Sequence, residues 1–314
     1  MKKIWIIGAG SIAKEYAKVL NSMGCEYTVI GRGLDSARIF KEVTGKEVIT
    51  GGLTQYLNTS PEIAGMAIVT TKVSELSAVT IELMNYGVKK IFCEKPGFLY
   101  PEQCDEVLNI SKQTNSKVYI AYNRRFFSSV LKTQEIIEED GGVTSFNFEF
   151  TEWSHIIGNL PYGKHLLAQN FYGNTTHVID LAFFICGKPT QLSCLTAGEL
   201  SWHKPAIFVG SGVTDKGALF CYQANWAAPG RWGVEILTSK HRLYLRPMEQ
   251  LQIQNIGSIA INPVEIDDNL DKEFKPGFYL ETQAFLEGNY SRLCSIEEQC
   301  DNVSRIYKKI RNSK

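Results

Sequence analysis

The hydrophobic pattern of the first 121 residues predicts strands that alternate with helices. Short apolar runs, typical of buried strands, lie at residues 4–7, 27–30, 48–50, 66–69, 90–93 and 118–121. Between them, helical periodicity follows the first run over about residues 12–20. Further helices are expected over 74–86, with Gly87 as C-cap, and over 101–114, with Pro101 in the first turn. This alternation predicts parallel βαβ units and an α/β fold.

From about residue 143 the pattern changes to a period of two. Phe146, Phe148 and Phe150 alternate with polar residues, which is typical of a strand with one buried face. Further strand-like runs lie at 192–196, 206–213, 218–226, 233–238 and 242–246. Neighbouring strands without intervening helices predict an antiparallel sheet. Two helices, at about 277–287 and 295–311, close the chain. We therefore expect two domains, residues 1–121 and 122–314, with the final helix able to pack back on the first.

A glycine motif joins the first run to the first helix. Gly8-Ala9-Gly10-Ser11-Ile12-Ala13 has the Gly-x-Gly-x-x-Ala spacing of a dinucleotide-binding turn, in the strand-to-helix setting that gives the motif its meaning. Gly8 permits the tight turn, Gly10 lets the backbone approach a pyrophosphate, and the helix N-terminus faces the phosphates. The motif predicts a Rossmann dinucleotide-binding domain; a chance Gly-x-Gly in a turn is the alternative.

The residues that follow the strands are the next candidates, because ligands of parallel sheets bind beyond the strands' carboxyl ends. The loops at Gly8, Arg32, Thr70, Glu94 and Tyr122 should converge on one crevice. An NAD-preferring fold usually has an acid after the second strand, where this chain has Gly31-Arg32. A guanidinium suits a 2′-phosphate, so we expect NADP(H), with NAD(H) as the alternative. The alternative is that Arg32 is only a solvated loop charge and that Asp35 binds the ribose, which would favour NAD(H).

Composition and charge narrow the class of protein. Of 314 residues 44% are hydrophobic, and 33 basic residues balance 33 acidic ones, so no global field attracts nucleic acid or a membrane surface. No run is long enough to span a bilayer, and the apolar run before Gly8 is too short for a signal peptide. We expect a cytoplasmic protein. The eight cysteines lack Cys-x-x-Cys and metal-type spacing, and Cys93 and Cys221 are expected to be buried, reduced thiols.

Several motifs together resemble the Gfo/Idh/MocA oxidoreductases. These are the glycine turn, Glu94-Lys95-Pro96 after the fifth strand, the segment Tyr122-Asn123-Arg124-Arg125-Phe126, and a His-x-x-Asp helix that begins near Thr175. The resemblance covers nearly the whole chain. It implies a Rossmann domain followed by an α+β domain with a large, mostly antiparallel sheet. It also implies hydride transfer between the nicotinamide C4 and a hydroxyl-bearing carbon of a sugar-like substrate.

The resemblance implies a catalytic role for Lys95. This lysine would lie near the nicotinamide and the substrate hydroxyl, whose proton must leave when hydride is removed. A partly desolvated lysine can have its pKa lowered toward neutrality, which suits general acid–base work. Relatives also imply a cis bond before Pro96. A surface lysine is the alternative. No metal is expected, because the cofactor carries the difficult chemistry.

His177 would be the second catalytic group by the same resemblance. The family commonly has an acid four residues earlier, but this chain has Gly173 there. The acid–base burden therefore moves toward Lys95 and His177, and Asn174 or Asn170 is left to hydrogen-bond the substrate. A buried structural histidine is the alternative.

Two further groups have a structural and a functional interpretation. Asp180 lies on the same helix face as His177 and is expected to be a structural partner. The cluster Trp226, Pro229, Arg231 and Trp232 offers aromatic faces and one cation suited to a sugar or a phosphate group. Core packing or a subunit contact is the alternative for these tryptophans.

We therefore expect an NAD(P)-dependent dehydrogenase or reductase for a sugar, cyclitol or sugar nucleotide, and a homo-oligomer formed through the C-terminal sheet. The expected cofactor contacts are Gly8, Gly10, Ser11, Ile12, Arg32, Thr70, Thr71, Glu94 and Lys95. The expected substrate contacts are Lys95, Tyr122, Arg124, Asn174 and His177, of which Lys95 and His177 are catalytic. The alternative is a catalytically silent regulator that binds a dinucleotide and a sugar. The missing acid at Gly173 favours it, and the presence of both catalytic residues argues against it.

Overall fold

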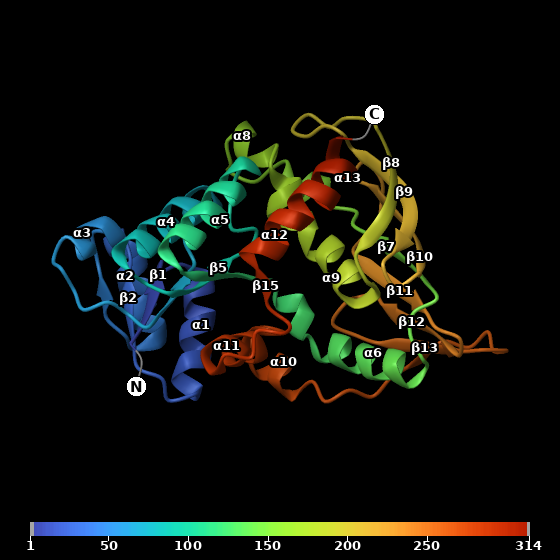
Figure 1. Cartoon of the computed structure of the whole chain (residues 1–314), viewed down its shortest axis with the longest axis horizontal. Helices are drawn as coiled ribbons and strands as arrows, with labels where there is room; N and C mark the ends of the chain where they lie inside the picture. Colours follow the sequence, from blue (N-terminus) through green and yellow to red (C-terminus); the bar gives the residue numbers. More distant parts are fainter. Residues whose placement is uncertain (1–2, 313–314) are drawn as a thin grey trace. The chain divides into compact units, whose positions relative to one another are not determined.

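The computed structural model describes residues 3–312, and the chain forms two compact units (Figure 1). The first unit is the chain up to Asn123 together with Lys272–Cys300. The second is Arg124–Asp271 together with the chain from Asp301 onward. This arrangement differs from the single division expected near residue 121, because a late segment returns to the first unit. Hydrophobic periodicity identifies such a segment's elements but not the sheet that they join.

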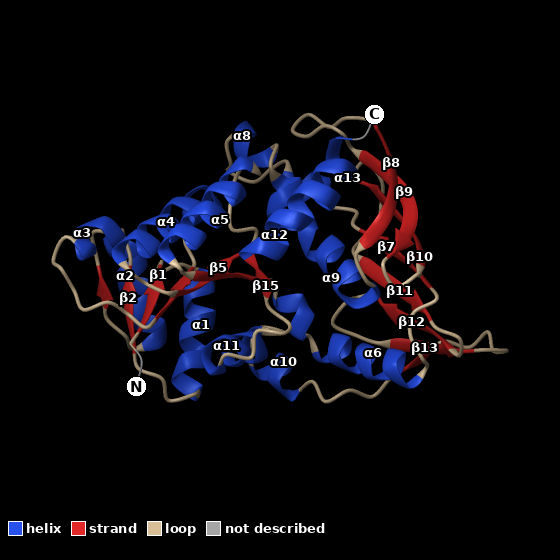
Figure 2. Cartoon of the chain, in the orientation of Figure 1, coloured by secondary structure: helices blue, strands red, loops and turns tan. Residues whose placement is uncertain are grey.

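The first unit is built on a seven-stranded sheet in the order β15-β6-β5-β4-β1-β2-β3. Helices cover both faces: α4 and α5 lie on one side in Figure 2, and α1 and α11 lie on the other. This covering explains the nearly continuous apolar character of the central strands. The parallel strands are β1 (Ile4–Ile7), β2 (Tyr27–Ile30), β3 (Val48–Ile49), β4 (Met66–Val69), β5 (Lys90–Glu94) and β6 (Lys117–Ala121), and the antiparallel β15 (Cys294–Ser295) pairs with β6.

The helices of the first unit agree with the expected caps. Gly87 ends α4 in the left-handed conformation, and Pro101 is the N-cap of α5. Helix α2 was not predicted; its buried face is narrow, formed by Ala37 and Phe40, while Leu34, Ile39 and Val43 are exposed and blur the apolar pattern. The helices are α1 (Ser11–Ser22), α2 (Leu34–Thr44), α3 (Leu53–Leu57), η1 (Val73–Glu75), α4 (Leu76–Tyr86), α5 (Glu102–Thr114), α11 (Phe278–Glu287) and α12 (Ile296–Asn302).

The second unit contains the large sheet expected from the period of two. Its order is β14-β13-β12-β11-β7-β10-β9-β8, and every neighbouring pair is antiparallel except β7 and β10, which are parallel. The strands are β7 (Ser145–Glu149), β8 (Pro189–Ala197), β9 (Ile207–Thr214), β10 (Leu219–Asn225), β11 (Gly233–Leu237), β12 (His241–Leu245), β13 (Gln252–Asn255) and β14 (Asn262–Pro263). The fold class is therefore confirmed.

The inner face of this sheet is packed with aromatic rings. Phe146 stacks on Phe220 at 5.2 Å between ring centres, and Phe183 of α9 packs edge-on against both. Helix α6 was not predicted. The second unit's helices are η2 (Asn123–Phe126), which starts at the unit boundary, α6 (Ser128–Glu139), α7 (Ser154–Ile157), α8 (Lys164–Leu167), η3 (Phe171–Thr175), α9 (Thr176–Cys186), η4 (Val303–Tyr307) and α13 (Lys308–Asn312), with α10 (Asn269–Glu273) at the second boundary.

The outer face of the sheet is open in this chain, which corrects one expectation. Cys93 is buried as expected, but Cys221 is exposed. The reason is the strand alternation: Phe220 and Tyr222 point into the core, so Cys221 points to the opposite face. An apolar run alone does not distinguish a strand that is covered on both faces from one that is covered on a single face.

A buried ion pair holds helix α9 to the start of the second unit. The Arg125 guanidinium donates two hydrogen bonds to the Asp180 carboxylate, at 2.8 and 2.6 Å, and both side chains are almost completely buried. Paired geometry compensates the cost of taking these charges out of water, whereas removal of either partner alone would leave a buried charge and cost about 3–5 kcal/mol. Asp180 is thus a structural partner, as expected.

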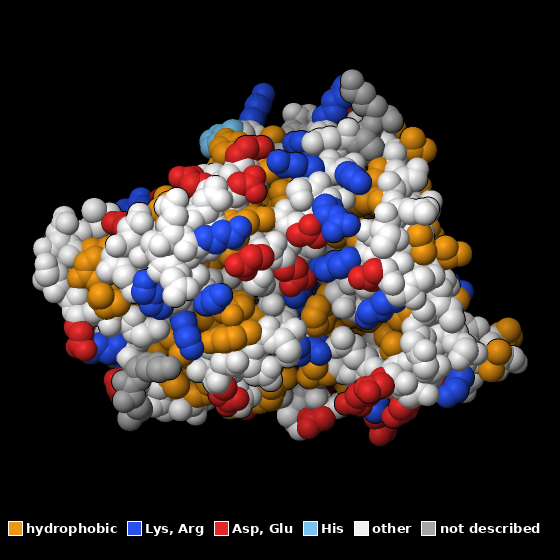
Figure 3. Space-filling model, viewed as in Figure 1, with side chains coloured by type: hydrophobic (Ala, Val, Ile, Leu, Met, Phe, Trp, Pro, Cys, Tyr) orange, Lys and Arg blue, Asp and Glu red, His pale blue; other side chains and the backbone are white. Residues whose placement is uncertain are grey.

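Charged groups of both signs are mixed on the surface. Figure 3 shows basic and acidic side chains interspersed over the face that it draws, in keeping with the net charge of zero. Within residues 3–312, no helix combines the length and the apolarity that crossing a lipid bilayer requires.

Candidate active site

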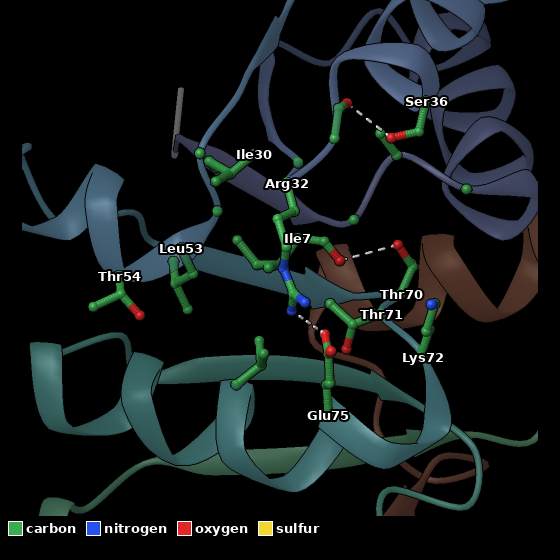
Figure 4. Close-up of a pocket in the computed structure, with 18 of the residues that line it drawn as sticks. Ile7, Ile30, Arg32, Ser36, Leu53, Thr54, Thr70, Thr71, Lys72 and Glu75 are labelled. Atoms are coloured by element: carbon green, nitrogen blue, oxygen red, sulfur yellow. Dashed lines mark hydrogen bonds and ion pairs between the residues drawn. The ribbon is translucent and has the colours of Figure 1, made fainter. Parts of the chain in front are cut away.

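A cavity of about 660 Å³ opens at the carboxyl ends of β1, β2 and β4 in the first unit (Figure 4). Five of the expected cofactor residues line it: Gly8, Gly10, Arg32, Thr70 and Thr71. The continuations of the Arg32 and Thr70 loops complete the wall, together with the segment after β3, which the sequence analysis did not single out. They contribute Gly33, Ser36, Gly51, Gly52, Leu53, Thr54, Lys72 and Glu75. The cavity therefore lies where the open side of a parallel sheet binds its ligands.

The two motif glycines have different physical roles. Gly8 has a φ of 118°, and a Cβ there would lie 2.6 Å from Thr70 Oγ1 and 2.9 Å from the Thr70 carbonyl oxygen. Only glycine tolerates both constraints. A Cβ on Gly10, in contrast, would meet no atom within 4 Å. Gly8 is thus required by the fold, whereas Gly10 keeps space open in the cavity.

The N-terminus of α1 faces this space without a side-chain cap. Gly10 is the N-cap residue and has extended backbone, and no described side chain hydrogen-bonds the first turn. The free N–H groups of a first turn carry a partial positive charge, which suits a phosphate group. Together with the open space at Gly10, this donor set fits the pyrophosphate of a dinucleotide. Ser11 and Ile12 begin this helix but do not line the cavity.

Arg32 extends into the cavity and forms an ion pair across it. Its guanidinium lies 2.5 Å from the Glu75 carboxylate at the start of α4, and Figure 4 shows the two side chains pointing toward each other. The preceding residue is glycine for a packing reason, because a Cβ on Gly31 would lie 2.9 Å from Val48 Cγ1. An acid therefore has no room at the end of β2, and the Arg32–Glu75 pair is a charged part of the cavity wall beside it.

Lys95 lies at the same edge of the sheet as the cavity. In the strand register Ile7 pairs with Val69, and Val69 pairs with Cys93, so Gly8, Thr70 and Glu94 are level. At the usual spacing of neighbouring strands, residue 94 is roughly 10 Å from residue 8. Glu94 and Lys95 are not part of the cavity wall itself. The bond between Lys95 and Pro96 is cis, as the resemblance implied.

A buried hydrogen-bond network lies behind Lys95. The phenol of Tyr16 contacts the carboxylates of Glu94, at 3.0 Å, and Glu281, at 3.2 Å. Desolvation raises the pKa of Glu94, and the charges of Lys95 and Lys275 oppose that rise. Desolvation and the two neighbouring carboxylates raise the pKa of Tyr16 well above its usual value. The phenol therefore stays protonated and serves as a permanent donor.

Tyr122 follows β6 at the same edge but is buried. Its hydroxyl and the Pro96 carbonyl oxygen both accept hydrogen bonds from the Gln299 side chain, at 3.1 and 2.9 Å. The returning segment thus supports the turn after Lys95. A substrate contact by Tyr122 stays a prediction.

In the second unit, His177 lies in the first turn of α9 and is 5% exposed. The imidazole ring is 6.2 Å from the ring of Trp232, and the same indole contacts the Arg124 guanidinium at 4.8 Å. Two of the expected substrate residues, His177 and Arg124, therefore meet on one tryptophan. The π-helical segment η3 leads directly into this helix, a feature that is frequent at functional sites.

A carboxylate that the sequence analysis missed lies beside this histidine helix. Glu152 is buried, and its carboxylate accepts hydrogen bonds from Asn174 Nδ2, at 3.1 Å, and from Thr175 Oγ1, at 2.8 Å. A Cβ on Gly173 would meet nothing within 4 Å. Although Gly173 itself carries no acid, Glu152 thus brings a carboxylate from another part of the chain to the two residues that follow it. Its only sequence signal was an acid placed just after β7.

Comparisons with known proteins agree with this fold. Residues 2–122 match the model of the Gfo/Idh/MocA "Oxidoreductase family, NAD-binding Rossmann fold". An uncharacterized oxidoreductase of Streptococcus pneumoniae serotype 4 is 24% identical over 246 residues, which are 74% of this chain. The match spans 64% of that relative's length.

Two solved structures are similar over nearly the full length. Levoglucosan dehydrogenase in complex with NADH has a TM-score of 0.77 and 17% identity, with 98% of this chain and 95% of that chain covered. UDP-N-acetylglucosamine 3-dehydrogenase from Acidithiobacillus ferrooxidans has a TM-score of 0.74 and 13% identity, with 99% and 96% covered. At these identities the similarity establishes the fold.

The different roles of the two glycines give a sharp test of the cavity. We expect Gly10→Val to weaken NAD(P)H binding at least about 10-fold, because its side chain fills space that the pyrophosphate needs. Its free energy of unfolding should fall by only about 1 kcal/mol, the usual cost of replacing a good N-cap residue, since the site is open and the backbone is not strained. Fluorescence titration and thermal unfolding measure the two quantities.

Gly8→Ala is the matched control and should destabilise the fold, because its Cβ meets Thr70. Unchanged cofactor affinity in a folded Gly10→Val variant would contradict the assignment of the cavity.

Proposed function

We propose that the chain is an NAD(P)-dependent dehydrogenase or reductase of the Gfo/Idh/MocA type, since residues 2–122 match the model of that family's NAD-binding Rossmann fold. Its substrate is a sugar, cyclitol or sugar nucleotide, oxidised or reduced at a hydroxyl-bearing carbon. The observation that carries this proposal is the shared sheet edge: the glycine cavity and Lys95 lie on it, two strands apart. Names of similar structures, among them a sugar and a sugar-nucleotide dehydrogenase, support the substrate class.

The chain's own residues have three tasks in this reaction. The uncapped N-terminus of α1 and Gly10 bind the pyrophosphate, as their donors and open space suggest. Lys95 takes the proton of the substrate hydroxyl during oxidation and returns it during reduction. His177 is the second proton-exchanging group. When bound, the nicotinamide supplies the acceptance and donation of hydride.

The negative charge near Lys95 is part of this mechanism. Glu94 interacts electrostatically with Lys95, and the permanent Tyr16 donor stabilises the ionised form of Glu94. Burial opposes this ionisation and raises the pKa of Glu94 overall, but in its ionised form Glu94 stabilises the ammonium form that Lys95 adopts after it takes up the proton.

Substitution of the two proposed catalytic residues tests the function. Lys95→Ala should lower kcat by about 10²–10⁴, the usual contribution of a general acid–base group, while the Kd for NAD(P)H changes less than about 3-fold. His177→Ala should also lower kcat. Absorbance of the reduced nicotinamide, followed across a panel of sugars, cyclitols and nucleotide sugars, measures turnover.

Lys117→Ala is the control, because Lys117 lies at the opposite, amino end of β6 and is exposed. Wild-type rates in both Lys95→Ala and His177→Ala would refute the mechanism. Binding of a dinucleotide and a sugar without turnover in the wild type would favour the regulatory alternative.

Arg32 supports a preference for NADP(H). Its guanidinium suits a 2′-phosphate, and Glu75 competes for it. Arg32→Ala should weaken NADPH binding by roughly 10-fold with little effect on NADH, and Glu75→Gln should tighten NADPH binding. Arg38→Ala is the control, since Arg38 pairs with Glu42 away from the cavity. Calorimetric titration measures both cofactors, and tighter NADH binding by the wild type would reverse the preference.

The open outer face of the second sheet supports a homo-oligomer. Leu195 of β8 is 65% exposed and pairs with the half-exposed Val209 of β9, and Figure 3 shows apolar side chains near these strands. We expect Leu195→Lys with Val209→Lys to convert the oligomer to a monomer in sedimentation velocity. Ile259→Lys, at an exposed loop residue outside this face, is the control. A monomeric wild-type protein would exclude this interface.

A further inference from the structure

An arginine of the second unit is held by two tryptophan rings. The guanidinium carbon of Arg231 lies 4.6 Å from the ring centre of Trp153 and 4.4 Å from that of Trp232, both within the range of cation–π contacts. Trp232 is buried, and the Trp153 indole N–H donates to the Gly230 carbonyl oxygen at 3.2 Å. The two rings are therefore anchored, and they restrict the guanidinium to a narrow range of positions.

The hydrogen-bond donors of this guanidinium are available. The side chain of Arg231 is 46% exposed, and its nearest charged partner, Glu152, lies 3.9 Å away, beyond hydrogen-bond distance. Among residues 3–312 no acceptor hydrogen-bonds Arg231. An ordered, accessible guanidinium of this kind is prepared to donate two parallel hydrogen bonds to a carboxylate or a phosphate.

Glu152 orients Arg231 without occupying its donors. The carboxylate is 1% exposed and already accepts hydrogen bonds from Asn174 and Thr175. It is thereby held against the segment that leads into α9. Its attraction for the guanidinium acts at a distance, so an anionic ligand does not have to displace it.

The same tryptophan connects Arg231 to the proposed proton-transfer group. The ring centre of Trp232 lies 4.4 Å from the Arg231 guanidinium carbon and 6.2 Å from the centre of the His177 ring. Trp153, 47% exposed, offers an aromatic face on which the C–H groups of a sugar ring pack well. A sugar bound here would have one end at Arg231 and its ring directed along the tryptophan toward His177.

We propose that Arg231, Trp153 and Trp232 form a substrate subsite that recognises the anionic group of a charged sugar, a carboxylate or a phosphate. This subsite deepens the proposed function and rests on it, because it assigns the substrate class of the same reaction. A neutral hydroxyl would accept a single N–H and leave the other donors unpaired, whereas an oxyanion accepts two in parallel. Carboxylate and phosphate share this chemistry, and the experiment separates them.

The test uses the full-length protein and matched sets of sugars. Each set contains a neutral hexose, the corresponding uronic acid, the 6-phosphate and the uridine diphosphate sugar, for the glucose, galactose and mannose series. Turnover is followed by the absorbance of the reduced nicotinamide, and binding to the Lys95→Ala variant is measured by calorimetry. We expect kcat/KM to be at least about 10-fold higher for anionic members than for their neutral counterparts. The best member identifies the carboxylate or the phosphate as the group that is recognised.

Variants locate the effect at Arg231. Arg231→Gln should raise KM for the anionic sugars by roughly 10–100-fold with kcat changed less than about 3-fold, and leave the neutral sugars unaffected. Arg231→Lys should recover only part of the affinity for the anionic sugars, because an ammonium lacks the two parallel N–H donors of a guanidinium. Arg242→Gln is the matched control: Arg242 is similarly exposed but pairs with Glu235. A purely structural role of Arg231 would instead change all substrates equally.

The outcomes distinguish this proposal from the function on which it rests. Turnover of neutral sugars alone, or an equal effect of Arg231→Gln on neutral and anionic members, overturns the subsite and leaves the dehydrogenase function intact. Binding of anionic sugars that Arg231→Gln abolishes, without turnover of any member by the wild type, supports the subsite and overturns the function. Neither binding nor turnover of any member overturns both.

Discussion

The close approach of β1 and β4 is the constraint on which the cofactor cavity depends. The Thr70 backbone N–H donates to the Ile7 carbonyl oxygen at 2.8 Å, and Gly8 turns away from the sheet against the same threonine. With any side chain at residue 8, Thr70 would have to move and β4 with it. Because the turn is so tight, α1 begins within three residues of the strand, and its first-turn donors face the cavity.

Strand register extends this geometry across the sheet. Level positions at the carboxyl ends carry Gly8, Thr70, Glu94 and Ala121, and Tyr122 follows one residue beyond. A lysine one residue beyond Glu94 therefore comes close to the cavity without any special loop. The buried Tyr16 network then sets its electrostatic surroundings, since a phenol that stays protonated can hydrogen-bond a carboxylate on either side. The strand register thus fixes the position of Lys95, and the buried Glu94 carboxylate interacts with its charge.

Much of this arrangement follows from local sequence, and the rest depends on tertiary contacts. The parallel strands of the first unit, the glycine turn, the C-cap at Gly87 and the helix start at Pro101 have local signals, and each was predicted, whereas the short antiparallel β15 was not. Cys221 was misplaced because an apolar run does not show whether both sheet faces are covered. Helix α6 was missed altogether. Glu152 was missed because its partners come from residues 174 and 175, and no local pattern announces such a contact.

The returning segment has a consequence for how such proteins diversify. Residues 272–300 bring Glu281 to Tyr16 and Gln299 to the turn after Lys95, so the first unit is complete only with sequence from near the C-terminus. A genetic exchange with a single crossover near residue 123 would separate the first 123 residues from the segment 272–300 that completes their unit. Transfer of the first unit alone to another protein would require three crossover points, after residue 123, before residue 272 and after residue 300. The two units should therefore be inherited together and diversify through substitutions within each.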